Sequence, residues 1–460
     1  MINISVREIG EITKGKIVSG EPGNLVNHFS TDSRKILSGD FFIAIKGKNF
    51  DAHVYIEEVL KKGASGIIAE GRVNPEVEKN APNYIVVKNS ITAMAEISRF
   101  LRLRSKARFV CITGTNGKTT TKDILGALLS PSFKVLKSPE SFNNVIGISL
   151  TLFGLEAEDE VAVMEVGTNH PGEIKELGNI LNPDIAVITN IGDGHLEFLK
   201  DRNGVFCEKI DLIREVKPGG IVILNGDDPY LSQCRAMFPE KIIKFVGTNK
   251  DADYKINSIN MIDDGYEFMM NGVNFFIPVL GEHNVYNAAA GLAVAIELGM
   301  PINLLKQKLL EVSLPNMRLA KVTHGGVTFI NDAYNANPVS FESAINVLKT
   351  IPSNGKKCVV AGAMLELGER SRELHEKVGG YIADKGIDYL VTVGDMASYI
   401  SKGALARGMK KENIFIVKTS EEAVLAIKNF LIQGDIVLVK ASRGSKMEEV
   451  IKCFITSFTR

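Results

Sequence analysis

The sequence predicts an α/β protein built from three domains. Short apolar runs rich in β-branched residues alternate with amphipathic segments of helical length along most of the chain, and this alternation is typical of parallel sheets covered by helices. With 460 residues, the chain is about three times a working domain size of roughly 150 residues. We expect domains at residues 1–97, 98–314 and 315–460.

The elements expected in the first domain are short. Apolar runs at 41–45 and 66–69 predict strands, and Gly-rich turns separate them. Apolar residues at helical spacing predict an amphipathic helix over 91–103. This segment is therefore expected to fold differently from the rest of the chain.

The other two segments show a longer alternation of strands and helices. In the middle segment, β-branched runs predict strands at 109–113, 161–165, 185–189, 221–224 and 242–246, with helices at 119–129 and 285–298. After Pro315, a second series predicts strands at 327–330, 357–361, 389–393, 414–417 and 435–439. The second series is expected to form an independent doubly wound domain.

Composition excludes several classes of protein. The chain has 54 Lys and Arg against 54 Asp and Glu, so no bulk basic field exists to hold a nucleic acid or an anionic membrane. Its longest nearly unbroken apolar run, 288–296, is about half of the ~20 residues of a membrane helix, and residues 1–10 lack the apolar stretch of a signal peptide. The five cysteines are scattered without a Cys-x-x-Cys pair, which disfavours disulfides and structural zinc. We expect a cytoplasmic protein with no nucleic-acid partner and no membrane insertion.

The strongest motif is Phe-Val-Cys-Ile-Thr-Gly-Thr-Asn-Gly-Lys-Thr-Thr at 109–120. It runs from an expected strand through a glycine turn into an expected helix, which is the context of a phosphate-binding loop. In such a loop Lys118 would reach the β- and γ-phosphates and the Thr119 hydroxyl would ligate Mg²⁺. The predicted ATP-binding residues are Gly114, Thr115, Asn116, Gly117, Lys118, Thr119 and Thr120. The alternative is a tight turn with a surface lysine.

Residues 113–121, Thr-Gly-Thr-Asn-Gly-Lys-Thr-Thr-Thr, resemble the Mur ligases, the ATP-dependent amide-forming enzymes of bacterial cell-wall precursor synthesis. Further segments agree with that family in chain order: 31–34 (Thr-Asp-Ser-Arg), 50–53 (Phe-Asp-Ala-His), 141–144 (Ser-Phe-Asn-Asn), 165–169 (Glu-Val-Gly-Thr-Asn), 190–195 (Asn-Ile-Gly-Asp-Gly-His) and 281–287 (Gly-Glu-His-Asn-Val-Tyr-Asn). Tyr-Asn-Ala-Asn-Pro at 334–338 and Met-Leu-Glu-Leu-Gly at 364–368 are most similar to the D-alanyl-D-alanine-adding branch. The Asp-Asn-Pro-Arg motif of the diaminopimelate- or lysine-adding branch is not found.

The resemblance implies both a fold and a reaction. The implied fold has an N-terminal UDP-binding domain, a central phosphate-loop ATPase domain with a mostly parallel sheet, and a C-terminal Rossmann-like domain. The implied reaction joins D-Ala-D-Ala to UDP-MurNAc-tripeptide through an acyl phosphate, with ATP cleaved to ADP and phosphate. These two molecules are the expected partners.

Three residues are expected to support the reacting groups beside the loop. Glu165 ends an apolar strand, where a carboxylate can face the phosphate loop and hold Mg²⁺. The resemblance implies a second Mg²⁺ at His195 and a carbamylated lysine at Lys209, so the expected catalytic residues are Lys118, His195 and Lys209. The metal ligands are then Thr119, Glu165 and His195. Without the resemblance, His195 would be an ordinary loop histidine and Lys209 an exposed helix lysine.

The resemblance also assigns the binding residues. It places Asn287 beside the adenine and the side chains of Arg318, Asp332 and Asn337 against the phosphates or ribose. The residues expected to bind the other substrates are Ser33, Arg34, Lys46 and His53 for the UDP moiety, Asn143 and Asn144 for the muramoyl-peptide side, and Arg443 for the third substrate. Helix capping is the alternative for Asn284, and Asn337 before Pro338 also fits an N-cap.

Three other functions compete with this interpretation. Another Mur-type amino-acid ligase and folylpolyglutamate synthetase have a similar architecture, although the loop of the latter continues Gly-Ser where this chain has Thr119-Thr120. The third alternative is a nucleotide-binding switch without ligase chemistry. A switch would turn over nucleotide alone, whereas a ligase would consume ATP only with acid and amine present.

Overall fold

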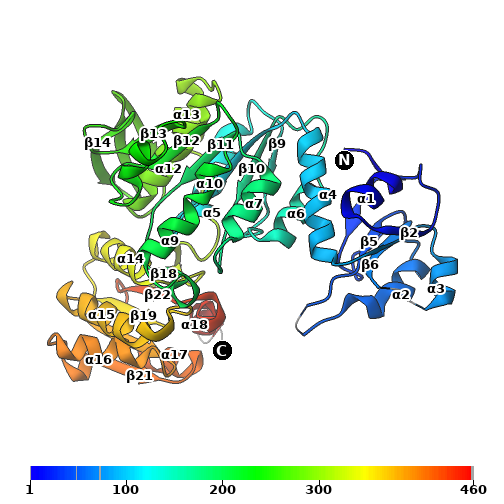
Figure 1. Ribbon diagram of the computed structural model, residues 1–460. Coiled ribbons are helices and arrows are strands. Elements are labelled where there is room, and N and C mark those ends of the chain that lie inside the picture. Colours follow the sequence, from blue (N-terminus) through cyan, green and yellow to red (C-terminus); the bar gives the residue numbers. More distant parts are fainter. Residues whose placement is uncertain (1, 48, 72–73, 457–460) are drawn as a thin grey trace.

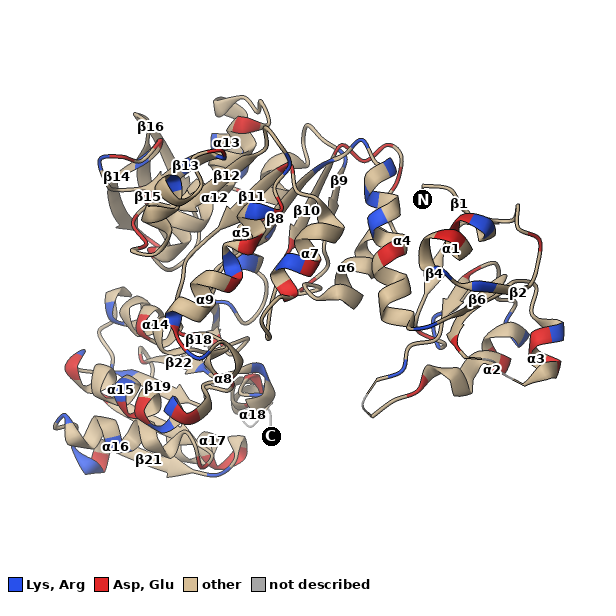
Figure 2. Cartoon of the chain, viewed as in Figure 1, with Lys and Arg blue, Asp and Glu red and all other residues tan. Residues whose placement is uncertain are grey.

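A computed structural model describes residues 2–47, 49–71 and 74–456. It has the mixed α/β, three-domain architecture that the sequence predicts, with N-terminal, central and C-terminal domains along the chain (Figure 1). Basic and acidic residues are interspersed on the helices of all three domains in the view of Figure 2. No helix within the described ranges is long and apolar enough to cross a membrane.

The N-terminal domain is built on a five-stranded sheet in the order β2-β7-β6-β5-β4, in which only β2 is antiparallel to its neighbour. A capping box of Ser5 and Glu8 starts its first helix. Its strands are β1 (Ile4–Ser5), β2 (Lys16–Ser19), β3 (Leu25–Val26), β4 (Phe29–Ser30), β5 (Phe41–Ile43), β6 (Gly66–Glu70) and β7 (Tyr84–Val87). Its helices are α1 (Val6–Thr13), η1 (Ala52–Tyr55), α2 (Ile56–Lys61), α3 (Pro75–Asn80) and α4 (Ser90–Arg104).

Helix α4 connects the N-terminal and central domains. It packs against α1 on one side and against α6 (Val145–Leu152) and α7 (Glu173–Leu181) on the other. Near its end, the buried Arg102 guanidinium donates to the carbonyl oxygens of Leu181 (2.6 Å) and Asn182 (2.9 Å) and pairs with Asp184 (2.9 Å). The boundary predicted near residue 97 lies inside this helix, which contacts both domains.

The central domain has a nine-stranded sheet in the order β16-β15-β14-β13-β12-β11-β8-β10-β9. Its strands are β8 (Arg108–Thr113), β9 (Val135–Lys137), β10 (Val161–Glu165), β11 (Ile185–Ile188), β12 (Ile221–Asn225), β13 (Ile242–Gly247), β14 (Tyr254–Ile262), β15 (Gly265–Met270) and β16 (Val273–Ile277). Besides α6 and α7, its helices are α5 (Lys118–Leu129), α8 (Leu196–Leu199), α9 (Arg202–Lys209), α10 (Asp211–Arg214), η2 (Leu231–Gln233), α11 (Cys234–Met237), α12 (His283–Glu297) and α13 (Ile302–Leu309).

Strand β8 determines where the phosphate loop lies. It runs parallel to both neighbours, and the register aligns Ile112 with Glu165 of β10 and Thr113 with Ile188 of β11. Alternate residues of β8 face opposite layers: Val110 and Ile112 belong to the core beside α5 and α12, and Phe109 to the core beside α7. The carboxyl ends of the three strands therefore meet at one edge, where ligands bind in open α/β sheets.

The predicted strands and helices of the central domain are confirmed within two residues at each end. The sequence interpretation did not anticipate the antiparallel strands β14, β15 and β16, which extend the sheet at its far edge. Their residues alternate between polar and apolar, so only one face is buried and no long apolar run marks them.

The C-terminal domain contains a six-stranded sheet in the order β17-β18-β22-β19-β20-β21, antiparallel only between β17 and β18. All five strands predicted after Pro315 are present, with small shifts at their ends. The strands are β17 (Ala320–His324), β18 (Val327–Asp332), β19 (Lys357–Ala361), β20 (Tyr389–Val393), β21 (Ile414–Val417) and β22 (Ile436–Lys440). The helices are α14 (Pro338–Thr350), η3 (Gly368–Arg370), α15 (Ser371–Asp384), α16 (Ser398–Ala406), η4 (Lys411–Asn413), α17 (Ser420–Lys428), η5 (Arg443–Ser445) and α18 (Glu448–Thr456).

Candidate active site

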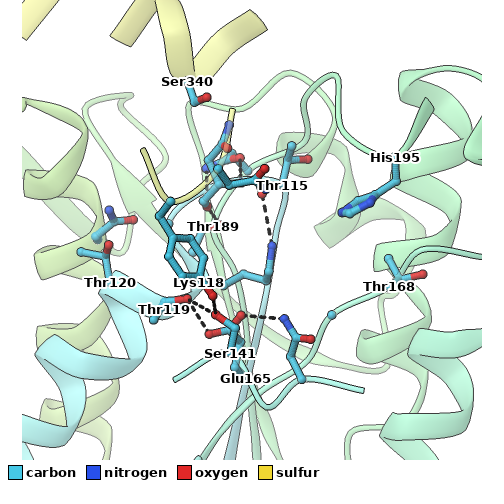
Figure 3. Close-up of a pocket in the computed structure, with 18 of the residues that line it drawn as sticks. Thr115, Lys118, Thr119, Thr120, Ser141, Glu165, Thr168, Thr189, His195 and Ser340 are labelled. Carbon is cyan, nitrogen blue, oxygen red and sulfur yellow. Dashed lines mark hydrogen bonds between the residues drawn. The ribbon is translucent and has the colours of Figure 1, made fainter. Parts of the chain in front are cut away.

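A cavity of about 970 Å³ lies where the carboxyl edge of the central sheet meets the C-terminal domain (Figure 3). The phosphate loop, the ends of β10 and β11 and the start of α12 form the central-domain side. The start of α14 and the loops after β19 and β22 form the opposite side. The cavity therefore brings together residues that the sequence separates by more than 300 positions.

Two glycines allow the loop to turn. Gly114 has φ +145°, and a Cβ atom there would lie 1.9 Å from the Thr189 hydroxyl oxygen. Gly117 has φ +85° at the N-cap of α5, and a Cβ there would lie 2.4 Å from Oδ1 of Asn287. Because a Cβ atom at either position would collide with these side chains, the loop can pack this closely only with glycine at both positions.

Lys118 lies half-buried in the cavity wall, and its ammonium donates to the carbonyl oxygens of Gly114 (2.8 Å) and Thr115 (3.2 Å). Burial lowers the pKa of this ammonium, and the nearby Glu165 carboxylate opposes the shift. The cation is thus held over the loop by its own backbone, at the place where a phosphate-loop lysine meets phosphate oxygens.

Glu165 and Thr119 form a buried pair beside the loop. The Thr119 hydroxyl donates to Oε2 of Glu165 (2.7 Å), and Nδ2 of Asn143 donates to Oε1 (2.9 Å). Glu165 is 1% exposed. These carboxylate and hydroxyl oxygens are ligands that Mg²⁺ prefers. No group of three or more His, Cys, Asp or Glu side chains suited to a metal occurs among the described residues, so the pair fits an ion whose other ligands are nucleotide phosphates and water.

Lys209 is 1% exposed at the end of α9, not on the surface. Burial holds the pKa of its amine well below the usual lysine value, the charge of Lys118 lowers it further, and Glu208 acts in the opposite direction. Glu208 itself accepts hydrogen bonds from the backbone N–H groups of Gly172 (2.7 Å) and Ile174 (2.8 Å). The amine of Lys209 is therefore biased toward the neutral form that reacts with CO₂.

His195 lies across the cavity from Thr120, and its imidazole points into the cavity (Figure 3). Its Nδ1 donates to Oε2 of Glu366, 2.7 Å away, in the C-terminal domain. The hydrogen bond with His195 lowers the pKa of the Glu366 carboxyl. Glu366 belongs to the Met-Leu-Glu-Leu-Gly segment, but the sequence interpretation gave it no role.

The residue expected beside the adenine, Asn287, belongs to α12. Nδ2 of Asn287 donates to Oδ1 of Asn284 (2.8 Å), and its Oδ1 accepts from the Thr121 hydroxyl (3.3 Å). The N-cap of α12 is Glu282, so the suggestion that Asn284 caps this helix is wrong. Asn284 instead donates from its amide to the Leu280 carbonyl (2.7 Å).

The C-terminal domain brings the other three nucleotide candidates to the loop. Arg318 donates to the Thr119 hydroxyl (2.8 Å) and lies 4.1 Å over the ring of Tyr334. Asn337 hydrogen-bonds the side chain of Asn116 and also caps α14, as its sequence context predicts. Asp332 lines the cavity as well.

The sequence interpretation did not anticipate two contacts around these candidates. Asp332 accepts from the ammonium of Lys440 (2.5 Å), which is buried at the end of β22. The Tyr334 hydroxyl hydrogen-bonds the hydroxyl of Ser141 (2.5 Å) across the domain boundary. Ser141 and Tyr334 both lie within the quoted family segments, but Lys440 follows an ordinary apolar strand and carries no local signal.

The residues assigned to the muramoyl peptide and the third substrate also line the cavity. Asn143 contacts Glu165 as described, and Asn144 caps α6 by accepting from the N–H of Gly147 (2.9 Å). Arg443 lies at the cavity wall beside Glu448, 2.5 Å away.

The four residues assigned to the UDP moiety lie in the N-terminal domain, outside this cavity. Arg34 is mostly exposed and forms a two-pronged pair with Asp32. His53 donates from Nδ1 to Asp51 (2.6 Å) and accepts at Nε2 from the N–H of Glu70 (2.9 Å). Its ring is therefore fully engaged within the domain. The remaining two, Ser33 and Lys46, lie on the same domain, Ser33 half-buried and Lys46 with its side chain 63% exposed.

Three protein-family models match the chain in order. "Mur ligase family, catalytic domain" matches residues 26–102, "Mur ligase middle domain" residues 112–295, and "Mur ligase, glutamate ligase domain" residues 317–443. The UDP-N-acetylmuramoyl-tripeptide--D-alanyl-D-alanine ligase of Bacillus subtilis is 35% identical over 99% of both chains.

Solved structures give the same result. MurF from Acinetobacter baumannii is 29% identical, covers 99% of both chains and superimposes with a TM-score of 0.90. MurF ligase from Thermotoga maritima, solved in complex with ADP, is 29% identical with a TM-score of 0.84, covering 94% of this chain and 98% of its own. The similarity therefore extends over all three domains.

Proposed function

Because the chain belongs to the Mur ligase family, we propose that it joins D-Ala-D-Ala to UDP-MurNAc-tripeptide and cleaves ATP to ADP and phosphate, a step of peptidoglycan precursor synthesis. The observation that carries the proposal is the full-length similarity to relatives of that name, in a chain whose phosphate loop, Glu165 and C-terminal-domain residues line one cavity. A carboxylate is a poor electrophile, so ATP is needed to convert it to an acyl phosphate.

The first step takes place at the phosphate loop. A carboxylate oxygen of the tripeptide attacks the γ-phosphorus, the bond to the β–γ bridging oxygen breaks, and ADP leaves. The backbone N–H groups of the loop and the Lys118 ammonium hold the phosphates. Asn143, adjacent to Glu165, is suited to orient the acid, and Arg318 adds positive charge from the C-terminal domain.

The second step uses the amine of D-Ala-D-Ala. Its neutral nitrogen attacks the acyl carbon, the bond between that carbon and the phosphate oxygen breaks, and the departing phosphate can accept the proton that the nitrogen loses. Arg443 at the cavity wall is suited to bind the carboxylate of this dipeptide. Docking of the C-terminal domain excludes water, which would otherwise hydrolyse the acyl phosphate.

Metal ions and a modified lysine complete the proposed site. Thr119 and Glu165 would hold one Mg²⁺, and His195 would face a second, where the ions would neutralise charge on the transferred phosphate. A carbamate on Lys209 would add anionic oxygen atoms of the kind that Mg²⁺ prefers. The buried, pKa-lowered amine supports this modification.

Phosphate release against a panel of acids and amines tests the proposal. Release should require UDP-MurNAc-tripeptide, D-Ala-D-Ala and Mg²⁺ together. Equal turnover with a folate and glutamate, or with another muramoyl peptide and a single amino acid, would move the chain to another ligase branch. Steady turnover with ATP alone would indicate a nucleotide switch. A mass spectrum of the active enzyme that shows only unmodified Lys209 would refute the carbamate.

A further inference from the structure

The loop that follows β19 in the C-terminal domain is fitted closely against the start of α8 in the central domain. Besides the hydrogen bond between His195 and Glu366, the N–H of Glu197 donates to the Glu366 carbonyl oxygen (3.2 Å). Gly368 approaches the same turn, since a Cβ atom there would lie 3.1 Å from the Cα of Glu197. Side chain and backbone of Glu366 thus both contact the turn that carries His195.

Both partners adopt a backbone conformation that side chains rarely take. His195 has φ +56° and Glu366 has φ +61°, each in the left-handed region. Such conformations cost roughly 1–3 kcal/mol and persist where the surrounding structure requires them, often at functional sites. Here each one turns a side chain toward the other domain.

The hydrogen bond determines what the imidazole can still do. A carboxylate only accepts, so Nδ1 of His195 carries a proton, and in the neutral imidazole Nε2 is then the lone-pair nitrogen. No hydrogen-bond partner of Nε2 occurs among the described residues, and His195 lines the cavity. In metal-binding histidines, a carboxylate on the second ring nitrogen fixes the ring orientation and raises the basicity of the ligating nitrogen.

We propose that Glu366 is a positioning residue for His195, so that the C-terminal domain completes the second cation site of the central domain only when it is docked. The proposal rests on the ligase function proposed above, because it needs a cation at His195. An exposed ion pair contributes about 0–1 kcal/mol, and the Glu366 side chain is 45% exposed. The contact between Glu366 and His195 therefore adds little to the free energy that holds the two domains together. Its geometry, however, selects one orientation and one tautomer of the imidazole ring.

The consequence is a coupling between domain position and catalytic competence. With the C-terminal domain undocked, the imidazole would lose its acceptor and could rotate or change tautomer. The cation site would then be weak whenever the amine-binding domain is away. Phosphate transfer from ATP would then be suppressed while the C-terminal domain is undocked, because the Glu366 side chain would be absent from the site.

Manganese binding to the full-length enzyme tests the proposal without turnover. Mn²⁺ would be titrated into the enzyme with saturating ADP and free Mn²⁺ followed by electron paramagnetic resonance. Glu366→Ala should weaken one class of Mn²⁺ site on the order of 10–100-fold, and Glu366→Gln, which keeps an oxygen acceptor, should weaken it less. Glu369→Ala removes an exposed acid three residues away, outside the cavity, and should leave Mn²⁺ binding unchanged.

A double variant separates positioning from a general structural effect. If Glu366 acts through His195, adding Glu366→Ala to His195→Ala should weaken Mn²⁺ binding no further. Additive losses, or wild-type Mn²⁺ affinity in a folded Glu366→Ala enzyme, would overturn the proposal. Unchanged melting temperatures would show that each variant is folded. Because no amine substrate is used, this result is independent of the substrate panel that tests the proposed reaction.

Discussion

Asn116 in the phosphate loop and Asn337 at the start of α14 join their side-chain amides by two reciprocal hydrogen bonds, of 2.8 and 3.3 Å. Oδ1 of Asn337 also accepts from the N–H of Ser340 (2.9 Å) and so caps the helix. One side chain therefore serves both the fold of the C-terminal domain and its contact with the nucleotide loop.

Asn116→Ala should weaken docking of the C-terminal domain without affecting the cap of α14. Two neutral hydrogen bonds contribute about 1–3 kcal/mol together, so we expect kcat/KM for the amine substrate to fall roughly tenfold. Steady-state phosphate release at varied D-Ala-D-Ala measures this. Asn274→Ala, at an exposed position of β16, is the control. Unchanged kinetics in Asn116→Ala would show that the amide pair is irrelevant to catalysis.

Lys118→Ala should lower ATP turnover by roughly 10²–10³-fold, because it removes a cation from the transferred phosphate. The fold should survive, since within the described part of the chain the Lys118 ammonium donates to carbonyl oxygens of its own loop and to no other element. Coupled phosphate release and circular dichroism test the two expectations. Lys106→Ala, an exposed substitution, serves as control. Wild-type turnover in Lys118→Ala would refute the phosphate-loop assignment.

The low pKa of the Lys209 amine should make stability depend on pH. In the unfolded chain this lysine regains an ordinary pKa of about 10.4. At any pH between the lowered pKa of the folded state and about 10.4, the unfolded state therefore binds more protons than the folded state. The free energy of unfolding of the wild type should therefore rise with pH in this window, by at most about 1.4 kcal/mol per pH unit. Lys209→Met should lack this contribution.

Urea denaturation in CO₂-free buffer between about pH 8 and pH 10 measures the two slopes. Lys106→Met, which changes an exposed lysine, should keep the wild-type slope. Identical slopes in the wild type and Lys209→Met would mean that the buried amine titrates normally.

Substitutions of His53 and Lys46 should have different effects in the N-terminal domain: the first should lower stability, and the second should weaken substrate binding. His53→Ala leaves the Glu70 N–H without its acceptor, so the free energy of unfolding should fall by about 1–3 kcal/mol. Lys46, with a side chain 63% exposed, should change stability little when replaced by Ala, but raise KM for the UDP substrate. Chemical denaturation and substrate titration distinguish the pair. A stable His53→Ala enzyme with an altered KM would reverse the two roles.

The sequence predicted the parallel cores well because continuous apolar strands leave a strong local signal. The run at β10 predicted both a buried strand and the position of Glu165 at its end. The strands β14 to β16 were not predicted because exposed or half-buried residues interrupt their buried ones, so no continuous apolar run marks them. Helix α4 was predicted as a helix, but its contacts with two domains depend on tertiary packing that spacing along the chain does not reveal.

The site residues that lie together in one short sequence motif could be predicted from the sequence. The residues that meet only through contacts between domains could not. The glycines, Lys118 and Thr119 could be recognised because a phosphate loop requires these residue types at this spacing. The pairing of His195 with Glu366 joins residues 171 positions apart. The burial of Lys209 depends on how α9 packs, and a short polar helix in isolation indicates an exposed lysine.

Helix α4 also bears on how far a substrate has to reach between the N-terminal domain and the phosphate loop. Its 15 residues form a rod about 22 Å long, held to the central domain by the buried bonds of Arg102. The resemblance assigns the UDP moiety of the substrate to the N-terminal domain, so the peptide of the proposed substrate would extend from there toward the phosphate loop of the central domain. Each extended residue adds about 3.5 Å, so the reach of the substrate would depend on the number of residues in its peptide.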